Sequence, residues 1–535
     1  MTRGPVLIPR TVKNATNLAA LTAAGLVIGL AAGRLALGPL ALLMHVTHHQ
    51  QDLAGLVGAG VGAAAGWVRW TRRQASAAPS TVHGSASFAP PDQVRRSMAV
   101  DKGLIVGREN RNAGKLLRYA GDAHLITIAP TRSGKGVGAI IPNLLTADRS
   151  ILCIDPKGEN ARITSKTRAK FGPVYVLDPF EASGDPTSAF NPLDQLDPES
   201  LDLAEDAGLI ADAMVCDPPG QTGDAHWNEE AKALITGLIL YTVCENPSYQ
   251  RNLATVRDYL TRSSEDFQKL LQAMQASSAA NGLIRRAANR HLGKSDREAS
   301  GVLSSAQRHT HFLDSPRIAG VTARSDFRFE DLKASSATVF LVLPPDRLDA
   351  NARWLRLMVS QGLQGLSRAP SCPSQLVLFL LDEFAALGRL EALERAFGLM
   401  AGYGIQLWPI LQDLHQLKST YGQAAGTFLS NAGLVQVFNV SDLETAHWVS
   451  SSLGSYTVSY QIDGSGSSTN LMQPFKTNST SATAHLAKRE LLTPDEVMRL
   501  GPDLAILMRQ GQEPVLARKV RYFRDPEFGD VTAKW

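Results

Sequence analysis

Short hydrophobic runs recur along the chain and predict the strands of a parallel sheet. They cover residues 125–128, 151–154, 174–177, 337–343, 376–381 and 407–411. Each run is almost entirely apolar, which is typical of strands that are covered on both faces. Several runs end in polar residues, and the carboxyl ends of parallel strands form the binding edge of open α/β sheets. We therefore expect an α/β fold with a mainly parallel sheet and a site at that edge.

A helical pattern separates these strands near the middle of the chain. In residues 201–214 and 229–243, apolar residues recur at three- and four-residue intervals, which is the spacing of one helix face. We predict an inserted all-α domain at residues 195–315. The α/β core then has a first part at residues 76–194 and a second part at residues 316–535.

The amino-terminal segment, residues 1–75, has the pattern of a membrane anchor. Residues 17–33 and 53–68 carry no charge, and each stretch is close to the ~17 to 25 residues that cross a bilayer. Basic residues precede the first stretch and follow the second: Arg3, Arg10, Lys13, Arg69, Arg72 and Arg73. The positive-inside rule then places both ends in the cytoplasm. We predict a transmembrane hairpin with helices at about 17–33 and 53–70, with a cleaved signal peptide as the alternative.

A polar segment interrupts the second part of the core. Residues 455–483 are rich in Ser, Thr and Gly, a composition typical of a flexible loop. After it, residues 491–500 have a helical pattern that Thr493 caps. Two further apolar runs, 504–508 and 515–520, predict a hairpin that ends the sheet.

The composition is that of a large folded protein. The chain has 535 residues, of which 44% are hydrophobic, and this is enough for two or three domains with cores of their own. The formal net charge of +4 permits nucleic-acid binding without establishing it. The four cysteines, Cys153, Cys216, Cys244 and Cys372, form no CxxC pair. We therefore expect reduced thiols and neither zinc ligands nor disulfides.

The sequence APTRSGKGV at residues 129–137 carries the first candidate chemistry. It follows the strand at 125–128 and precedes an apolar helical face. Backbone N–H groups and the positive end of a helix dipole converge at such a turn, where Lys135 adds a charge. We predict that a nucleoside triphosphate binds to Thr131, Arg132, Ser133, Gly134, Lys135, Gly136 and Val137. An ordinary basic turn is the structural alternative.

Two positions differ from the common phosphate-loop pattern. Ala129 stands where a glycine is usual, and an alanine fits there only if its φ is negative. Gly136 stands where a Ser or Thr hydroxyl usually binds Mg²⁺. The metal must then take another oxygen, with Ser133, Thr131 and water as the candidates.

Asp382 and Glu383 supply a second element of the site. They directly follow the apolar run 376–381, and two acids at the end of a buried strand are costly unless they have a use. In a phosphate-loop ATPase, the first acid holds Mg²⁺ through its water shell and the second orients and deprotonates the attacking water. The alternative role is to cap the following helix.

Gln412 follows the strand at 407–411 in a comparable place. An ATPase of this sort has a polar residue there that senses the γ-phosphate, and the position at the carboxyl end of a strand favours that role. Capping of the next helix is the alternative.

Several separated segments together resemble a known family. They are APTRSGKGVG, ILCIDPKGE, VLDPF, HWNEEAKALITGLIL, LLDEFAALGRL, AGYGIQLWPILQDL and SNAGLVQVFNVSDLETAHWVSSSLG. They occur in order between about Gly84 and Phe528. The chain thereby resembles the type IV secretion coupling proteins, the TraG type of conjugal DNA-transfer ATPase.

This resemblance implies more than the spacing of motifs can show. It implies a RecA-like P-loop ATPase of the bacterial inner membrane, with cytoplasmic catalytic domains, an inserted all-α domain and a homo-hexameric ring. ATP and Mg²⁺ would be its cofactors. Its partners would be single-stranded DNA in a relaxosome or protein effectors, together with components of a type IV secretion channel. Lys135 would hold the phosphates, Asp382 would serve Mg²⁺, Glu383 would activate water and Gln412 would sense the γ-phosphate.

One departure from the family concerns the arginine that completes a neighbouring subunit's site. Some relatives place it just before the sensor strand, where this chain has Ala401 and Gly402. Arg389 and Arg395 are the remaining candidates, although solvated helix charge is the better supported role for both.

Two other functions stay open at the level of sequence. A membrane-tethered translocase of double-stranded DNA would carry a basic, helix-turn-helix-like carboxyl-terminal module, which the sequence does not suggest. A docking scaffold that binds nucleotide without hydrolysis would suit the altered phosphate loop. Against the scaffold stand Lys135, Asp382 and Glu383, which are all present.

Overall fold

The computed structural model describes residues 81–111, 113–217, 225–369, 375–468 and 477–529. It divides into two compact units. The larger unit, Ala86–Gly454 with Glu490–Trp535, holds the sheet and all the predicted site residues. The predicted transmembrane hairpin lies in residues 1–80, outside the described ranges. Within those ranges, no helix is both long enough and apolar enough to cross a membrane.

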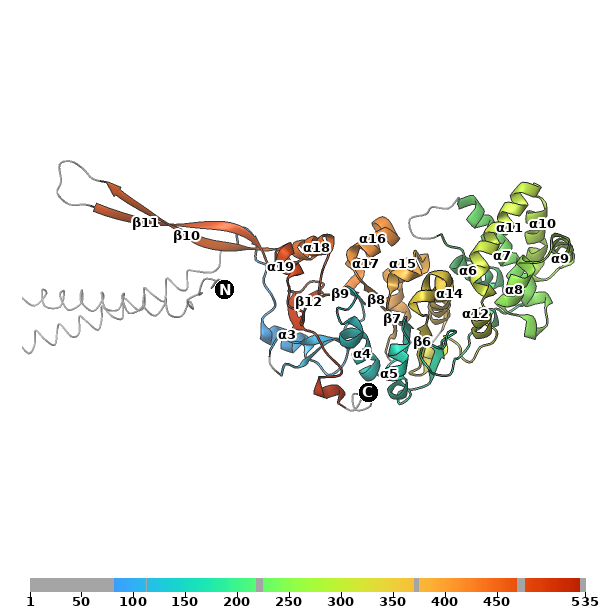
Figure 1. Ribbon diagram of the computed structural model, residues 1–535, viewed down its shortest axis with the longest axis horizontal. Helices are drawn as coiled ribbons and strands as arrows, with labels where there is room; N and C mark the ends of the chain where they lie inside the picture. Colours follow the sequence, from blue (N-terminus) through green and yellow to red (C-terminus); the bar gives the residue numbers. More distant parts are fainter. Residues whose placement is uncertain (1–80, 112, 218–224, 370–374, 469–476, 530–535) are drawn as a thin grey trace, which may run out of the picture. The chain divides into compact units, whose positions relative to one another are not determined.

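The larger unit is built on an eleven-stranded sheet with the order β2-β1-β13-β12-β9-β3-β8-β7-β4-β6-β5 (Figure 1). Its strands are β1 Leu104–Glu109, β2 Leu116–Tyr119, β3 His124–Ile128, β4 Ile151–Asp155, β5 Val174–Leu177, β6 Thr338–Val342, β7 Val377–Leu381, β8 Ile405–Leu411, β9 Ala432–Val437, β12 Leu504–Arg509 and β13 Val515–Arg518. The seven strands from β9 to β5 in that order all pair in parallel. The prediction of an α/β fold with a mainly parallel sheet is confirmed.

The parallel strands bring distant segments to one edge of the sheet. Ile154 of β4 is in register with Leu381 of β7, and Ile128 of β3 is in register with Leu411 of β8. The residues that follow these four strands therefore leave the sheet side by side. The predicted phosphate loop, the two acids and Gln412 all begin at this edge.

Helices cover both faces of the parallel strands, which explains why the strands are apolar throughout. On one face, α4 (Ile141–Thr146) and α5 (Glu159–Arg168) pack against residues such as Cys153 and Leu380. On the other face lie α14 (Pro345–Arg368), α15 (Glu391–Leu399), α16 (Leu414–Tyr421) and α17 (Ala425–Asn431), which pack against residues such as Ile154 and Leu381. Figure 1 shows α4 and α5 below the strands and α14 to α17 above them.

Four more α-helices of this unit lie outside the insertion, and their buried side chains join the apolar clusters of the sheet. They are α3 (Pro91–Met98), α13 (Asp331–Ala334), α18 (Leu443–Leu453) and α19 (Pro494–Met498). Thr493 caps α19, as predicted. The cap is a capping box, in which the side chain of Glu496 accepts from the backbone N–H of Thr493.

Between β5 and β6, every regular element of the described chain is a helix. Besides α13, its α-helices are α6 Leu203–Met214, α7 Ala225–Glu245, α8 Leu253–Leu260, α9 Ser264–Ala276, α10 Leu283–Leu292, α11 Asp296–Thr310 and α12 Pro316–Val321. Their buried side chains, such as Leu238 and Leu271, belong to the same apolar cluster as Ile154 and Leu381 of the sheet. The insertion and the core thus share one continuous apolar interior.

The predicted carboxyl-terminal hairpin is present, but it does not end the sheet. Strands β12 and β13 pair antiparallel, and β12 also pairs antiparallel with β9. On the other side, β13 continues to β1, and β1 continues to β2. The prediction missed β1 and β2, which add two further antiparallel strands beyond the hairpin.

The prediction of a loop at residues 455–483 is wrong for most of that segment. Strands β10 (Ser455–Ser468) and β11 (Thr477–Glu490) form a separate two-stranded sheet, most of which belongs to the smaller unit. Ser85 forms an antiparallel bridge with Tyr456 in the same unit. The segment is rich in Ser and Thr, and its Thr, Val and Tyr residues favour extended backbone. Polarity alone was therefore a poor guide to its structure.

Candidate functional site

The predicted site residues line one cleft of about 580 Å³ at the carboxyl edge of the parallel strands. The cleft is lined by Thr131, Arg132, Gly134, Lys135, Gly136, Val137, Ile141, Asp155, Pro156, Lys157, Glu159, Asn160, Pro345, Leu348, Asp382, Glu383 and Gln412. Ser133 is the one predicted residue that is not part of the lining. The structure therefore brings together segments of the chain that lie far apart in the sequence.

The phosphate loop has the backbone that its sequence predicts. Arg132 has a φ of 62° and Gly134 a φ of 91°, so residues of opposite handedness alternate. Alternation of this kind turns successive N–H groups toward one side and forms an anion-binding nest. Ala129 is buried and is not among the described residues with positive φ, which fulfils the condition for an alanine at that position.

The helix that follows the loop begins with one widened turn. Residues Gly136–Ile140 form a π-helix, in which the N–H of Ile141 bonds to the carbonyl of Gly136. Pro142 explains this turn, because it has no N–H for the carbonyl four residues earlier and its ring would crowd that carbonyl. The helix then continues as α4. Its first N–H groups lie beside the cleft, where the helix dipole favours an anion.

Lys135 meets both acids. Its Nζ lies 2.8 Å from Oδ1 of Asp382 and 2.9 Å from Oε1 of Glu383. The side chains of Lys135 and Asp382 are 13% and 14% exposed, so the pair is largely shielded from solvent. The meeting of the loop lysine with two strand-end acids is the central geometric feature of the cleft.

Burial and pairing act in opposite directions on the charges of this cluster. Burial lowers the pKa of Lys135, but the two carboxylates outweigh it and leave the pKa raised. Burial raises the pKa of Asp382, and Lys135 only partly offsets this rise. The Asp382 carboxylate thus carries its charge at a cost, and a further cation beside it would favour the ionised form.

Gln412 connects the acids to the phosphate loop. Its Nε2 donates to Oε2 of Glu383 at 3.1 Å, and its Oε1 accepts from the hydroxyl of Thr131 at 3.2 Å. Its backbone N–H donates to the side chain of Gln416. Helix α16 is capped by Asp413, whose side chain accepts from the N–H of Gln416. The capping role considered for Gln412 therefore falls to its neighbour, and the Gln412 side chain faces the cleft.

The turn between β4 and α5 also lines the cleft, and sequence reasoning did not assign it to the site. Asp155 is buried, and its Oδ2 accepts the N–H of Ala161 at 2.9 Å. Burial raises the pKa of Asp155 to about 6, although backbone N–H groups of Ala161 and Lys157 oppose the rise. The signal was visible, since the strand at 151–154 ends in DPKGE.

Two of the predicted hydroxyl ligands differ in their placement. Thr131 lines the cleft, whereas the Ser133 hydroxyl is buried and has no hydrogen-bond partner among the described residues. The backbone carbonyl of Ser133 accepts from Nζ of Lys519 at 2.7 Å. Lys519, which directly follows β13, thus stabilises the phosphate loop through this backbone carbonyl.

Arg389 and Arg395 lie outside the cleft lining. Arg389 forms an ion pair with Glu394 at 3.5 Å, and Arg395 forms one with Glu391 at 3.4 Å. Their side chains are 59% and 58% exposed. Arg395 lies on α15 and Arg389 lies just before it, and both side chains are largely exposed in this single chain.

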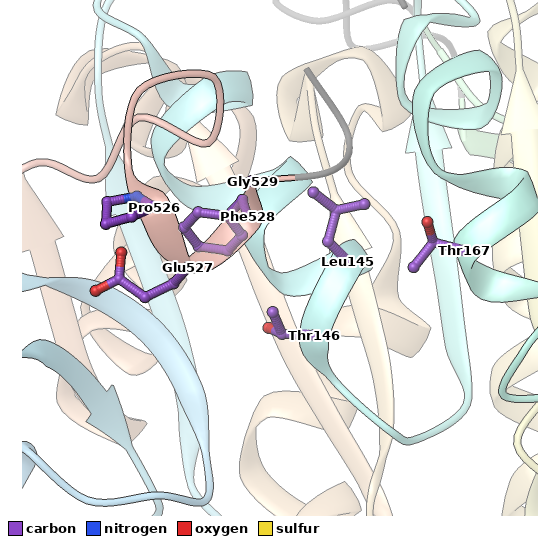
Figure 2. Close-up of a pocket in the computed structure, with 7 residues that line it drawn as sticks. All are labelled: Leu145, Thr146, Thr167, Pro526, Glu527, Phe528 and Gly529. Atoms are coloured by element: carbon purple, nitrogen blue, oxygen red, sulfur yellow. The ribbon is translucent and has the colours of Figure 1, made fainter. Parts of the chain in front are cut away.

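A second cavity, of about 400 Å³, lies between α4, α5 and the short helix Pro526–Phe528 (Figure 2). Its lining is mostly apolar or hydroxylic, with Leu145, Thr146, Thr167 and Phe528 around it. The one ionisable lining side chain, Glu527, is engaged by Arg108 at 2.7 Å. This cavity contains none of the predicted site residues, and we assign no chemistry to it.

A phosphate loop after β3, two acids after β7, with β8 between these strands, and a mainly parallel sheet are typical of RecA-like P-loop folds. Residues 91–535 match the family model described as "Type IV secretory system Conjugative DNA transfer". The chain belongs to this family.

Individual relatives agree with this assignment. The chain is 30% identical over 463 residues to the conjugal transfer protein TraG of Escherichia coli, which covers 80% of this chain and 72% of TraG. It is 29% identical over 457 residues to protein VirD4 of Rhizobium rhizogenes, which covers 83% of this chain and 66% of VirD4.

The fold is similar to solved structures of the plasmid coupling protein TrwB. The complex of TrwB with the non-hydrolysable ATP analogue ADPNP matches with a TM-score of 0.59 and 17% identity, over 83% of this chain and 96% of TrwB. TrwB in complex with ADP and Mg²⁺ matches with the same TM-score.

Proposed function

We propose that this chain is a coupling ATPase of a type IV secretion system, which hydrolyses ATP to drive the transfer of DNA or protein substrates. The observation that carries the proposal is the cluster of Lys135, Asp382, Glu383 and Gln412 in one cleft. Membership of the conjugative DNA transfer family supports the substrate class. The names of the relatives TraG and TrwB point to the same role.

The phosphate loop would bind the triphosphate. The alternating backbone at Arg132 and Gly134 turns N–H groups into the cleft, and the helix that starts at Gly136 adds its dipole. Lys135 would move its ammonium from the acids to the β- and γ-phosphates. Without nucleotide, Lys135 forms an ion pair with Glu383. Binding of the phosphates would break this pair and free the Glu383 carboxylate to activate water.

Asp382 would hold Mg²⁺ through the water shell of the ion. Mg²⁺ commonly binds through one or two carboxylates together with substrate phosphates and several waters, and the buried Asp382 carboxylate beside the loop fits that arrangement. Bound there, the ion would neutralise charge that develops on the phosphates. Of the hydroxyls considered for the ligand missing at Gly136, Thr131 lines the cleft and Ser133 does not. Thr131 or a water is thus the better supported replacement.

Glu383 would act as the general base and Gln412 as the sensor of the γ-phosphate. The two side chains are joined by a hydrogen bond of 3.1 Å, so a change at one alters the position of the other. Gln412 also contacts Thr131 in the loop. Loss of the γ-phosphate would therefore change a short series of contacts that runs from Thr131 through Gln412 to Glu383.

Membrane anchoring and a hexameric ring complete the proposal. The charge-free stretches at residues 17–33 and 53–68 support an inner-membrane anchor. In a ring, conformational change at each ATP site would move one subunit against the next and drag the bound strand. Binding of the strand through its phosphates would weaken as salt rises. The helical insertion would be the surface that receives relaxosome or effector.

Phosphate release by the purified full-length chain in detergent tests the proposal. We expect hydrolysis of ATP that single-stranded DNA stimulates, and we expect Lys135→Ala to reduce it to background because the phosphates lose their counter-charge. Equal release from both proteins would favour a non-hydrolysing docking scaffold. Stimulation by double-stranded DNA alone would favour a translocase of duplex DNA.

A further inference from the structure

Helix α14 links the nucleotide cleft to the helical insertion. Pro345 and Leu348 in its first turn line the cleft. Further along, Arg356 is 4% exposed, and its guanidinium donates to three backbone carbonyls. Nη1 donates to Leu387 at 2.6 Å and to Arg389 at 2.7 Å, and Nε donates to Ala213 at 3.2 Å.

Two of these acceptors belong to the turn that directly follows the acids. The short helix Phe384–Leu387 begins right after Glu383. Glu383 has a φ of 52° and Gly388 a φ of 60°, so left-handed residues stand at both ends of the turn. A non-glycine residue in this region costs free energy and persists only where surrounding contacts hold it. Arg356 supplies such contacts at Leu387 and Arg389.

The third acceptor lies in the helical insertion. Ala213 is in the last turn of α6, where carbonyls have no partner within the helix. Arg353, about one turn earlier on α14, donates to the carbonyl of Cys216 at 3.1 Å. Both arginines therefore hold the end of α6, but Arg356 also holds the turn after Glu383. The two residues form a matched pair for comparison.

We propose that Arg356 is a positioning residue that fixes the Glu383 carboxylate for water activation and ties the turn after it to α6 of the insertion. The inference rests on the proposed function, because it assigns Glu383 a role in hydrolysis. A displacement at the α6 end would reach the turn after Glu383 through one buried guanidinium. The planar fork of arginine suits three carbonyls at fixed angles, whereas a lysine ammonium is a compact donor that cannot span them.

Steady-state phosphate release by the full-length protein tests this role. We expect Arg356→Gln to lower kcat at least tenfold and to leave the KM for ATP within twofold, because the phosphate loop is not among its contacts. Arg356→Lys should recover only part of kcat. Arg353→Gln, the matched control, should keep both constants within twofold of wild type. Wild-type kcat in Arg356→Gln, or equal losses in both glutamine variants, would overturn the inference.

A second variant perturbs the same turn and leaves the arginine in place. A Cβ at Gly388 would meet only Nη1 of Arg356, at 3.7 Å, but the φ of 60° disfavours any side chain. Gly388→Ala should therefore strain the turn alone and lower kcat with little change in KM. If Arg356→Gln does not fold, an unchanged kcat in Gly388→Ala overturns the proposal.

Amide hydrogen exchange separates this inference from the proposed function. If the wild-type protein releases no phosphate, the proposed function fails, yet exchange can still be measured. We expect faster exchange at residues 383–389 in Arg356→Gln and unchanged exchange there in Arg353→Gln. Equal exchange at 383–389 in wild type and Arg356→Gln would show that the arginine does not hold the turn.

Discussion

Lys135 lies within 3 Å of both acids, and each of these residues had a local signal in the sequence. A lysine in a Gly-containing turn after a strand is typical of a phosphate loop, and acids directly after a buried strand are costly without a ligand or partner. Such signals identify the residues that touch a ligand. Arg356 left no comparable signal, since its partners are backbone carbonyls, which any residue can provide.

At the residue scale, Gly136 offers a direct test of the missing hydroxyl. A Cβ at Gly136 would have no atom within 4 Å, so a serine fits there. We expect Gly136→Ser to lower the Mg²⁺ concentration that half-saturates phosphate release several-fold, because a hydroxyl returns to the place where phosphate loops usually supply one. The measurement is a Mg²⁺ titration of phosphate release.

Gly136→Ala is the control for that change. It should leave the helix intact, because alanine has a higher helix propensity than glycine, and it should not shift the Mg²⁺ titration. The nearby Gly138 does not allow the same substitution, because a Cβ there would lie 2.9 Å from the carbonyl of Val520. An equal Mg²⁺ shift in the serine and alanine variants would show that the hydroxyl is not the cause.

At the scale of elements, the sequence predicted strands well where they were uniformly apolar. Strand β8 begins two residues earlier than predicted, at Ile405, because Gln406 interrupts the apolar run. Gln406 is nevertheless buried, since its Nε2 donates to the carbonyls of Gly121 and Ala123. Those partners are distant in sequence. A buried polar residue can therefore be placed in a strand only when the neighbouring strands are known.

The same reason explains why β9 was not predicted. Gln436 stands in its middle and is buried. Its Oε1 accepts from Thr127 at 2.8 Å, and its Nε2 donates to the carbonyl of Val106 at 2.7 Å. Each partner lies on another strand of the sheet. Tertiary pairing thus outweighs the local pattern at both glutamines.

An ion-pair cluster in the helical insertion gives an element-scale prediction. Glu230 on α7 accepts from Arg290 at 2.6 Å and pairs with Lys294 at 2.9 Å. Hydrogen bonds from Arg290, followed by those from Lys294, lower the pKa of Glu230 from 4.5 to about 2. Because the folded pKa is the lower one, this stabilisation is complete above pH 4.5 and is lost as the pH falls toward 2.

Thermal unfolding at a series of pH values checks this prediction. We expect Glu230→Gln to be less stable than wild type by about 1 kcal/mol at pH 7, as is usual for a partly exposed ion pair. The difference should shrink below pH 4.5 and vanish near pH 2. A difference that stays constant down to pH 2 would contradict the assigned cause.

At the scale of the whole molecule, the parallel sheet determines which distant residues meet. The helical insertion joins β5 to β6, which lie at one end of the strand order. Strand β4 lies between β6 and β7, so the strands that lead to the site residues stay next to one another in the sheet. The sequence predicted a core interrupted by helices, because the period of apolar residues changes there. It could not predict that the insertion shares its apolar interior with the sheet. Shared burial depends on which helix faces meet, and a pattern along one chain does not specify that.

The central claim is that two distant segments form one site that hydrolyses ATP. The most direct test measures the nucleotide that remains bound to Glu383→Gln after incubation with ATP and Mg²⁺. The variant keeps the size of the side chain and its contact with Gln412 but removes the base. We expect it to retain ATP while the wild-type protein contains ADP. ADP in both proteins would contradict the account.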